Sequence, residues 1–339
     1  MNKKDQLFIE ACKNGNIIEA EKLLKKTLFS KPADIHSVTS YGKTALMIAV
    51  ENKQPEMVDF LIAKGVDVND GFYPGGRSAI RLAIDYEKCN DKNTLAIVSS
   101  LISAGANPNV QTDKKESLLN AVLGEDPKND TNKVYEVIAK LLLQGEANIN
   151  TPSLKWGMLP LHQASSNGYV EITKILIEKG ANVNATTSNG YSPLMLACYA
   201  GHEQIVDLLI KNGANINQKD AVEKTPLIAA AQNGYKSIVS ILIAEGANIN
   251  EKDKYLNTAL TYSPNYEIAD LLIKNGAQIN ERNHRGETPL IFATINKRKD
   301  VVALLIANGA NVTCKDDEHK QAIDYATEDI RVLFQNFDN

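Results

Sequence analysis

The sequence has few cysteines, few aromatic residues and no long apolar segment. Its four cysteines (Cys12, Cys89, Cys198 and Cys314) lie far apart and form no C-x-x-C pair, so neither a disulfide framework nor a zinc spacing is predicted. No stretch is apolar over the length of a membrane span, and the first residues contain no apolar signal segment. We therefore expect reduced thiols, no membrane insertion and a cytoplasmic location. An effector exported to a host cytosol without such a signal would have the same features.

Charge of one sign is also lacking. The 37 basic and 41 acidic residues give a formal net charge of −4, so no overall field favours a nucleic acid or an anionic membrane. The P-loop, G-x-G-x-x-G, H-E-x-x-H and G-x-S-x-G motifs are absent, and the five histidines do not fall at related positions. We therefore predict no enzyme, no cofactor, no metal site and no nucleic-acid partner.

What the sequence does have is an internal repeat. Gly180, Gly213 and Gly246 lie 33 residues apart, each after a Leu/Ile-rich run and each opening the pattern G-A-N-V/I-N. A fixed period of this length indicates a stack of like units rather than one globular core. We predict an all-α chain of stacked helix-turn-helix pairs joined by turn or hairpin loops.

Recurring residues predict where the two helices of each unit begin and end. Ser192, Thr225 and Thr288 each precede a proline; the hydroxyl can accept hydrogen bonds from the first-turn amides, and proline has no amide to lose. The glycine after the second helix suits the left-handed backbone that ends it. Small residues on the first helix allow close packing, and the apolar residues of the second helix, here Ile205, Val206, Leu208, Leu209 and Ile210, should fill the core between units.

The units are not all alike. We expect a single domain over residues 1–339, with an opening cap of two helices at 5–36, eight repeats at 37–313 and a closing cap at 314–339. Insertions lie near 85–94 and 123–133, both between paired helices, and the second helix is expected to restart at Leu95 after the first of them. One repeat, near 258–280, is three residues short, and Pro264 interrupts its first helix.

These features resemble the ankyrin repeat: G-x-T-P-L-H-x-A, a glycine after the second helix, then A-x-V-N, most closely over residues 157–317. The histidine survives only as His162, with Met47, Arg81, Met195, Ile228, Thr261 and Ile291 in its place elsewhere. The loop before the first helix is here called the finger. Its glycine is replaced by Glu223 and Leu256 in two repeats, so these two fingers are expected to be less regular. The resemblance implies a curved solenoid that binds another protein on a concave face formed by fingers and first helices.

The repeat frame places much of the scarce aromatic content on that face. Aromatic residues make up 6% of the chain, which has a single tryptophan. Tyr and Trp are enriched in interface hot spots, so we favour an interface over mutual packing of adjacent fingers. A basic spot for an acidic partner could form at Arg77, Arg81 and Lys155. The predicted partner-binding residues are Tyr41, Tyr73, Arg77, Arg81, Lys155, Trp156, Ser166, Tyr191, Tyr199, Gln232, Tyr255 and Ile295.

Several residues carry a second interpretation. The resemblance implies possible hydroxylation of the loop residues Asn184, Asn217, Asn250 and Asn280; the alternative is that each side chain bonds to the backbone of its own turn. For His162 and Cys198 we favour structural positions in the repeat over a catalytic base and a reactive thiol. For Asp316, Asp317 and Glu318 we favour a solvated acidic turn over a cation site.

The leading hypothesis is a non-catalytic, monomeric scaffold or adaptor that binds a partner protein. The competing class is a bacterial effector or modifying enzyme with a cryptic site in the two inserted loops or around Tyr262, Ser263 and Pro264. A nucleic-acid reader would need a basic stripe that the balanced charge does not supply.

Overall fold

A computed structural model describes residues 2–27, 31–71, 78–84, 91–112, 115–124, 133–154 and 156–335. The chain divides into two compact units, unit 1 from Met1 to Lys179 and unit 2 from Gly180 to Asn339. Over the described ranges the regular elements are helices, so the predicted all-α repeat fold is confirmed. The fingers are turns rather than hairpins of extended strands, with isolated bridges such as Val38 to Thr44.

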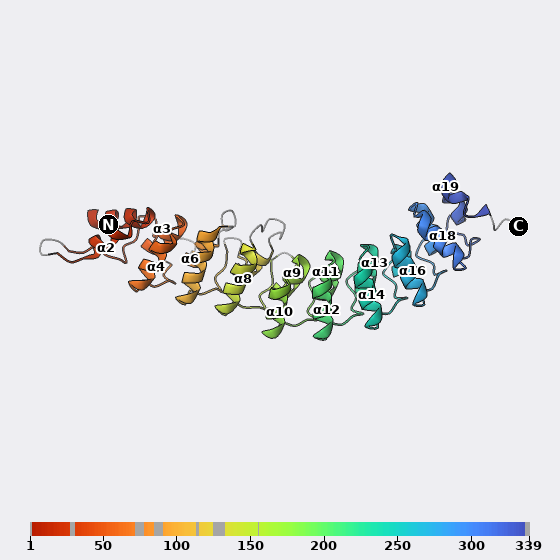
Figure 1. Cartoon of the computed structure of the whole chain (residues 1–339), viewed down its shortest axis with the longest axis horizontal. Helices are drawn as coiled ribbons and strands as arrows, with labels where there is room; N and C mark the ends of the chain where they lie inside the picture. Colours follow the sequence, from red (N-terminus) through yellow and green to blue (C-terminus); the bar gives the residue numbers. More distant parts are fainter. Residues whose placement is uncertain are drawn as a thin grey trace. The chain divides into compact units, whose positions relative to one another are not determined.

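Unit 1 consists of short antiparallel helix pairs (Figure 1). The first helices of neighbouring repeats pack on one another, as α7 does on α9, and the second helices do the same, as α6 does on α8. The helices are α1 (Lys3–Lys13), α2 (Ile17–Leu24), α3 (Ala45–Glu51), α4 (Pro55–Ala63), α5 (Ala79–Ala83), α6 (Lys92–Ser103), α7 (Leu118–Leu123), α8 (Val134–Gln144), α9 (Pro160–Asn167) and α10 (Val170–Glu178).

Unit 2 repeats the same arrangement more regularly (Figure 1). Here α11 packs on α13 and α12 on α14, and the last first-helix position is held by a short 3-10 helix, η2. The helices are α11 (Pro193–Ala200), α12 (Glu203–Lys211), α13 (Pro226–Gln232), α14 (Lys236–Ala244), α15 (Ala259–Tyr262), α16 (Tyr266–Lys274), α17 (Pro289–Ile295), α18 (Lys299–Ala307), η2 (Ala322–Tyr325) and α19 (Glu328–Arg331).

The predicted helix signals act as expected. The hydroxyls of Ser192, Thr225 and Thr288 accept hydrogen bonds from the amide three residues later at 3.2, 3.3 and 3.3 Å, and a proline follows each. In unit 2 the glycines after the second helices have left-handed φ angles, from +83° at Gly213 to +94° at Gly276. After α8 in unit 1, Gly145 has a φ angle of −79°, and the next residue, Glu146, has the left-handed one at +65°. In α12, Ile205, Val206 and Leu209 are fully buried, whereas Leu208 and Ile210 are only half-buried.

Three features concern the helix boundaries: one differs from the prediction, one agrees with it and one explains it. α6 begins at Lys92, three residues before the predicted restart at Leu95, because the Asp91 carboxylate accepts a hydrogen bond from the Thr94 amide at 2.8 Å and caps the helix. α15 ends at Tyr262, before Pro264 as predicted. The guanidinium of Arg298, from the next repeat, donates to the carbonyls of Tyr262 and Ser263 at 3.1 and 2.8 Å and satisfies the end of this short helix.

Candidate functional site

Each regular finger is a five-residue turn organised by the side chain at its first position. In the finger Asp253–Asn257, the Asp253 amide donates to the Asn257 carbonyl at 3.0 Å, and Asp253 Oδ1 accepts from the amides of Tyr255 and Asn257 at 2.9 Å each. Asp220, Asn283 and Asp316 do the same in their fingers. The hydrogen bonds to this first-position oxygen thus fix the shape of the turn, and the middle of the turn faces solvent.

The fourth position of these turns has a left-handed backbone whether or not it is glycine. Glu223 and Leu256 have φ angles of +60° and +59°, close to the +78° of Gly190. Their amides donate to the first-position carbonyl at 2.9 and 2.8 Å, as that of Gly190 does at 2.9 Å. The expectation that these two fingers are less regular is therefore wrong, because the side-chain bonds of Asp220 and Asp253 maintain the turn without glycine.

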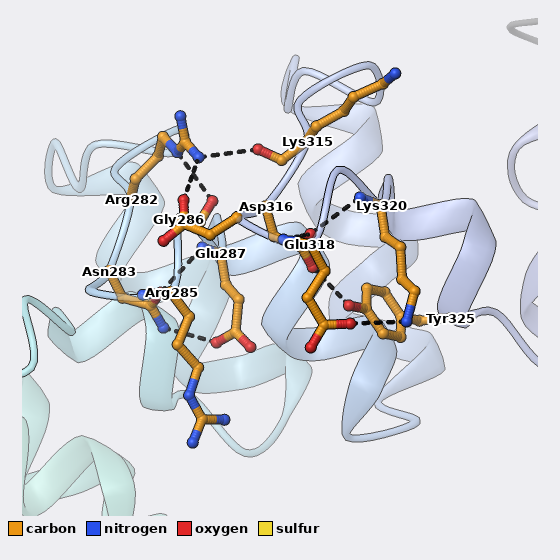
Figure 2. A network of polar contacts seen from close by, with 11 residues as sticks. Arg282, Asn283, Arg285, Gly286, Glu287, Lys315, Asp316, Glu318, Lys320 and Tyr325 are labelled. Atoms are coloured by element: carbon orange, nitrogen blue, oxygen red, sulfur yellow. Dashed lines mark hydrogen bonds and ion pairs between the residues drawn. The ribbon is translucent and has the colours of Figure 1, made fainter.

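Successive fingers of unit 2 are also bonded to one another. The Ala221, Lys254, His284 and Asp317 amides each donate to a carbonyl of the preceding finger at 2.9 to 3.0 Å. Figure 2 shows the last two fingers, where Arg282 Nη2 donates to the Lys315 carbonyl at 3.0 Å and contacts Asp317 at 3.3 Å. The fingers of unit 2 therefore form one bonded row rather than independent loops.

Asp316 corrects the expectation of a solvated acidic turn. It is buried, and its Oδ2 accepts a hydrogen bond from the Tyr325 hydroxyl at 2.6 Å (Figure 2). Burial acts to raise the pKa of Asp316, but the Tyr325 hydroxyl and the Lys320 and Glu318 amides outweigh it and hold the pKa below its usual value. Asp317 and Glu318 do remain exposed.

Tyr191 and Tyr199, two predicted binding residues, lie together. Their rings meet edge to face at 5.8 Å, and both are half-buried. Burial, followed by the nearby carboxylate of Asp220, raises the pKa of Tyr199. Asp220 Oδ2 is buried with no hydrogen-bond partner in the described chain. The pair therefore forms an aromatic surface beside a buried carboxylate.

A polar network supports Tyr255 and the shortened repeat. The Tyr262 hydroxyl donates to Asp253 Oδ2 at 2.7 Å and accepts from Asn257 Nδ2 at 3.0 Å, and its ring meets Phe292 edge to face at 6.0 Å. Asn257, Tyr262 and Phe292 line an open pocket of about 240 Å³. Tyr255, at its rim, is 54% exposed. The half-buried Tyr262 and the buried Asp253 thus support an exposed aromatic residue, which the repeat frame alone did not indicate.

The remaining predicted residues of unit 2 lie on exposed surface. Gln232 is at the end of α13, where its Oε1 accepts from Lys224 Nζ at 2.7 Å. The same Lys224 lies 4.9 Å from the centre of the Tyr262 ring. Ile295 ends α17 and is 38% exposed.

In unit 1, Tyr41 is 74% exposed at the centre of the finger 39–43. Trp156 is 52% exposed in a finger one residue longer than the finger 39–43 and the fingers of unit 2, and here the Ser153 amide donates to the Met158 carbonyl at 2.7 Å. Trp156 and Gly157 both have left-handed φ angles, +71° and +63°. Ser166, on α9, lines the same pocket as Trp156. Tyr73, Arg77 and Lys155 lie outside the described residues.

The structure corrects the prediction that Arg81 lies on the binding face. This arginine is buried, with 9% of its surface exposed, so it does not present a charge on the binding face. It occupies the position that the repeat gives to histidine, and the residues at that position in other units point inward: Met47, His162 and Met195 are fully buried. The prediction of a basic spot is therefore wrong for Arg81. Its other two predicted members, Arg77 and Lys155, fall outside the described residues.

The loop asparagines join neighbouring repeats instead of closing their own turns. Asn184 Nδ2 donates to the Gly213 carbonyl at 3.0 Å, and Asn184 Oδ1 accepts from the Asn215 amide at 2.7 Å, one repeat further on. Asn217, Asn250 and Asn280 accept in the same way from Asn248, Gln278 and Asn311 at 2.8 Å each. The interpretation of a bond within the same turn is wrong for these four residues; Asn182 and Asn215, two positions earlier, make that bond.

The residues with potential chemistry have structural surroundings. His162 is fully buried, and its Nδ1 accepts from the Leu159 amide at 3.1 Å. Cys12 and Cys198 are buried single thiols, and burial raises the pKa of Cys12 to about 12. Within the described ranges, three or more His, Cys, Asp or Glu side chains nowhere gather in a way that would hold a metal ion. No helix among these residues is long and apolar enough to cross a bilayer.

A family model described as ankyrin repeats (3 copies) matches residues 7–112, 80–186, 128–220, 219–283 and 263–336. These overlapping matches cover nearly the whole chain. Ankyrin repeats generally mediate protein–protein interaction, and the family is typically non-enzymatic.

Three relatives are similar over part of the chain. Alpha-latrocrustotoxin-Lt1a of Latrodectus tredecimguttatus is 29% identical over 142 residues, which is 42% of this chain and 9% of that protein. The ankyrin repeat and KH domain-containing protein mask-1 of Caenorhabditis elegans is 28% identical over 216 residues, or 57% of this chain and 8% of that protein. The B-cell lymphoma 3 protein homolog of Mus musculus is 27% identical over 167 residues, 49% and 34%. The chain thus spans a minor part of each relative.

Proposed function

The chain belongs to the ankyrin repeat family, and we propose that it is a non-catalytic scaffold that binds a partner protein through its fingers and first helices. The observation that carries the proposal is the exposure of large aromatic side chains at finger positions. Tyr41, Trp156 and Tyr255 are each more than half exposed. Exposed aromatic residues of this size are typical anchors of protein interfaces.

The way in which these residues are held favours binding over accidental exposure. Tyr255 lies at the middle of a turn fixed by Asp253, which is itself held by the Tyr262 hydroxyl. Trp156 keeps a left-handed backbone, a conformation that costs a residue with a side chain about 1 to 2 kcal/mol. Rigid anchors lose little conformational freedom on association, so such surfaces bind efficiently.

The test is partner capture by matched variants of the full chain. Trp156→Ala and Tyr255→Ala should each reduce the amount of a specific protein recovered from source lysate by about tenfold, while the melting temperature stays nearly unchanged. Tyr266→Ala is the matched control, because Tyr266 is 46% exposed at the start of a second helix rather than on a finger. Equal capture by all variants would contradict the proposal, as would a large loss of melting temperature in both finger variants.

A second proposal is that the loop asparagines are substrates of an asparagine hydroxylase. Asn184 and Asn280 are exposed, and their bonds to the next repeat are made by the carboxamide, so a hydroxyl group on Cβ breaks none of them. Intact-mass analysis after hydroxylase treatment should show additions of single oxygen atoms. Asn184→Ala and Asn280→Ala should each remove one of them, and an unchanged mass of the wild-type chain would reject the idea.

A further inference from the structure

One pocket in unit 1 contains hydrogen-bond acceptors that the described chain does not satisfy. The pocket has a volume of about 320 Å³ and lies among α7, α9 and the finger that carries Trp156. Asn120 of α7 and Gln163 of α9 line it, and Asn120 Oδ1 and Gln163 Oε1 are both buried without a hydrogen-bond partner. In native proteins such oxygens are nearly always paired, with the protein, with ordered water or with another bound group.

The orientation of the Asn120 carboxamide is fixed by its other atom. Asn120 is fully buried, and its Nδ2 donates to the Thr151 carbonyl at 2.7 Å, which leaves Oδ1 as the unpaired atom. Gln163 is 7% exposed and lies one helical turn before Ser166 on α9. The two unpaired oxygens therefore come from two different helices that pack on each other.

The other polar atoms of the pocket indicate what would pair with these acceptors. Asn167 Nδ2 already donates to the Leu123 carbonyl at 2.7 Å, so this donor is used within the fold. Glu116 adds a carboxylate to the lining, and Trp156 adds a half-exposed indole ring. A carboxylate, an aromatic face and unpaired carbonyl oxygens together favour a cationic ligand rich in N–H donors.

We propose that this pocket receives the guanidinium group of an arginine side chain presented by the partner protein. The proposal rests on the proposed function and assigns one chemical feature to the partner. Guanidinium is planar and carries five N–H donors in a fixed fork, so it can bridge acceptors on two helices while it stacks on the Trp156 ring. The ammonium group of lysine is compact and strongly hydrated, and it has no planar face to stack.

The single tryptophan of the chain provides a direct readout, because Trp156 lies in the pocket lining. The full chain is titrated with acetyl-arginine amide, acetyl-citrulline amide and acetyl-lysine amide while tryptophan emission is recorded. Citrulline keeps the shape of arginine without its charge. The arginine derivative should give a saturable change, with binding about tenfold tighter than that of either other derivative.

Variants of Gln163 test the acceptor. Gln163→Leu should weaken binding of acetyl-arginine amide about tenfold, and Gln163→Glu should strengthen it by a similar factor, because the added charge favours guanidinium. Gln204→Leu, a change to an exposed glutamine of the second helix α12, is the control and should have no effect. Far-UV circular dichroism confirms that each variant is folded.

Equal responses to the arginine and lysine derivatives would overturn the assignment, as would arginine binding that neither Gln163 variant alters. Partner capture distinguishes this failure from failure of the proposed function. If Trp156→Ala still loses the partner in that case, the scaffold function stands and only the arginine pocket falls.

Discussion

Single residues in the fingers of unit 2 show how side chains replace glycine. Glu223 and Leu256 have the left-handed backbone that glycine adopts freely. The bonds from Asp220 and Asp253 to the amides of the turn offset this cost. The backbone shape of these turns is therefore determined more by the residue at the first position than by the residue at the fourth position.

Glu223→Gly should stabilise the protein by about 1 kcal/mol, because relief of the left-handed strain exceeds the added freedom of glycine in the unfolded chain. Val222→Gly, at the neighbouring position without a positive φ, is the control and should destabilise by about 0.5 to 1 kcal/mol. Urea unfolding of the full chain measures both. A loss of stability in Glu223→Gly would show that the turn stores no strain.

Asp316 should make stability depend on pH. Its folded pKa is lowered, so its contribution is present above the unfolded value of about 3.9 and is lost as the pH falls through the lower folded value. Asp316→Asn should destabilise at pH 7 by about 1.5 to 3 kcal/mol and flatten the acid limb of the stability curve. Unfolding measured from pH 3 to 7 checks this; Glu318→Gln, on the exposed side of the same finger, should leave the curve unchanged.

At the scale of the element, α15 is too short to complete its own carbonyl bonding, and Arg298 supplies the missing donors. The guanidinium also lies 5.7 Å from the centre of the Phe292 ring. Burial lowers the pKa of Arg298, yet arginine stays protonated at physiological pH. The shortened repeat therefore depends on its C-terminal neighbour.

Arg298→Ala should cost about 2 to 3 kcal/mol, since it removes charge-assisted bonds to the carbonyls of Tyr262 and Ser263. Lys299→Ala is the control: its ion pair with Asp329 is on the surface at 3.7 Å and should be worth less than about 1 kcal/mol. Thermal unfolding compares the two variants. Similar small losses would mean that water caps α15 equally well.

Adjacent leucines of α12 test the packing between helix pairs. Leu209 is fully buried and Leu208 is half-buried. Leu209→Ala should cost about 2 to 5 kcal/mol, as a buried truncation does, and Leu208→Ala clearly less. Denaturant unfolding of both variants measures the difference, and equal losses would contradict the packing register of α12.

Across the whole molecule, the sequence predicted the features that depend only on residues close together within one repeat. Ser192, Thr225 and the following prolines mark helix starts, and Gly213 marks a helix end, because these signals act within a few residues. The bond of Asn184 to Gly213 depends on a residue that a neighbouring repeat brings close. The unpaired oxygens of Asn120 and Gln163 likewise emerge only when two helices pack, so no local pattern reveals them.

The bonds made by the loop asparagines of unit 2 have a consequence for hydrogen exchange. The backbone amides of Asn215, Asn248, Gln278 and Asn311 each donate to an asparagine side chain of the preceding repeat. Each of these protons can exchange with solvent only when the two repeats separate locally or the loop opens. Four amides on exposed loops should therefore exchange slowly, and the rate at each one reports how often its repeat parts from the one before it.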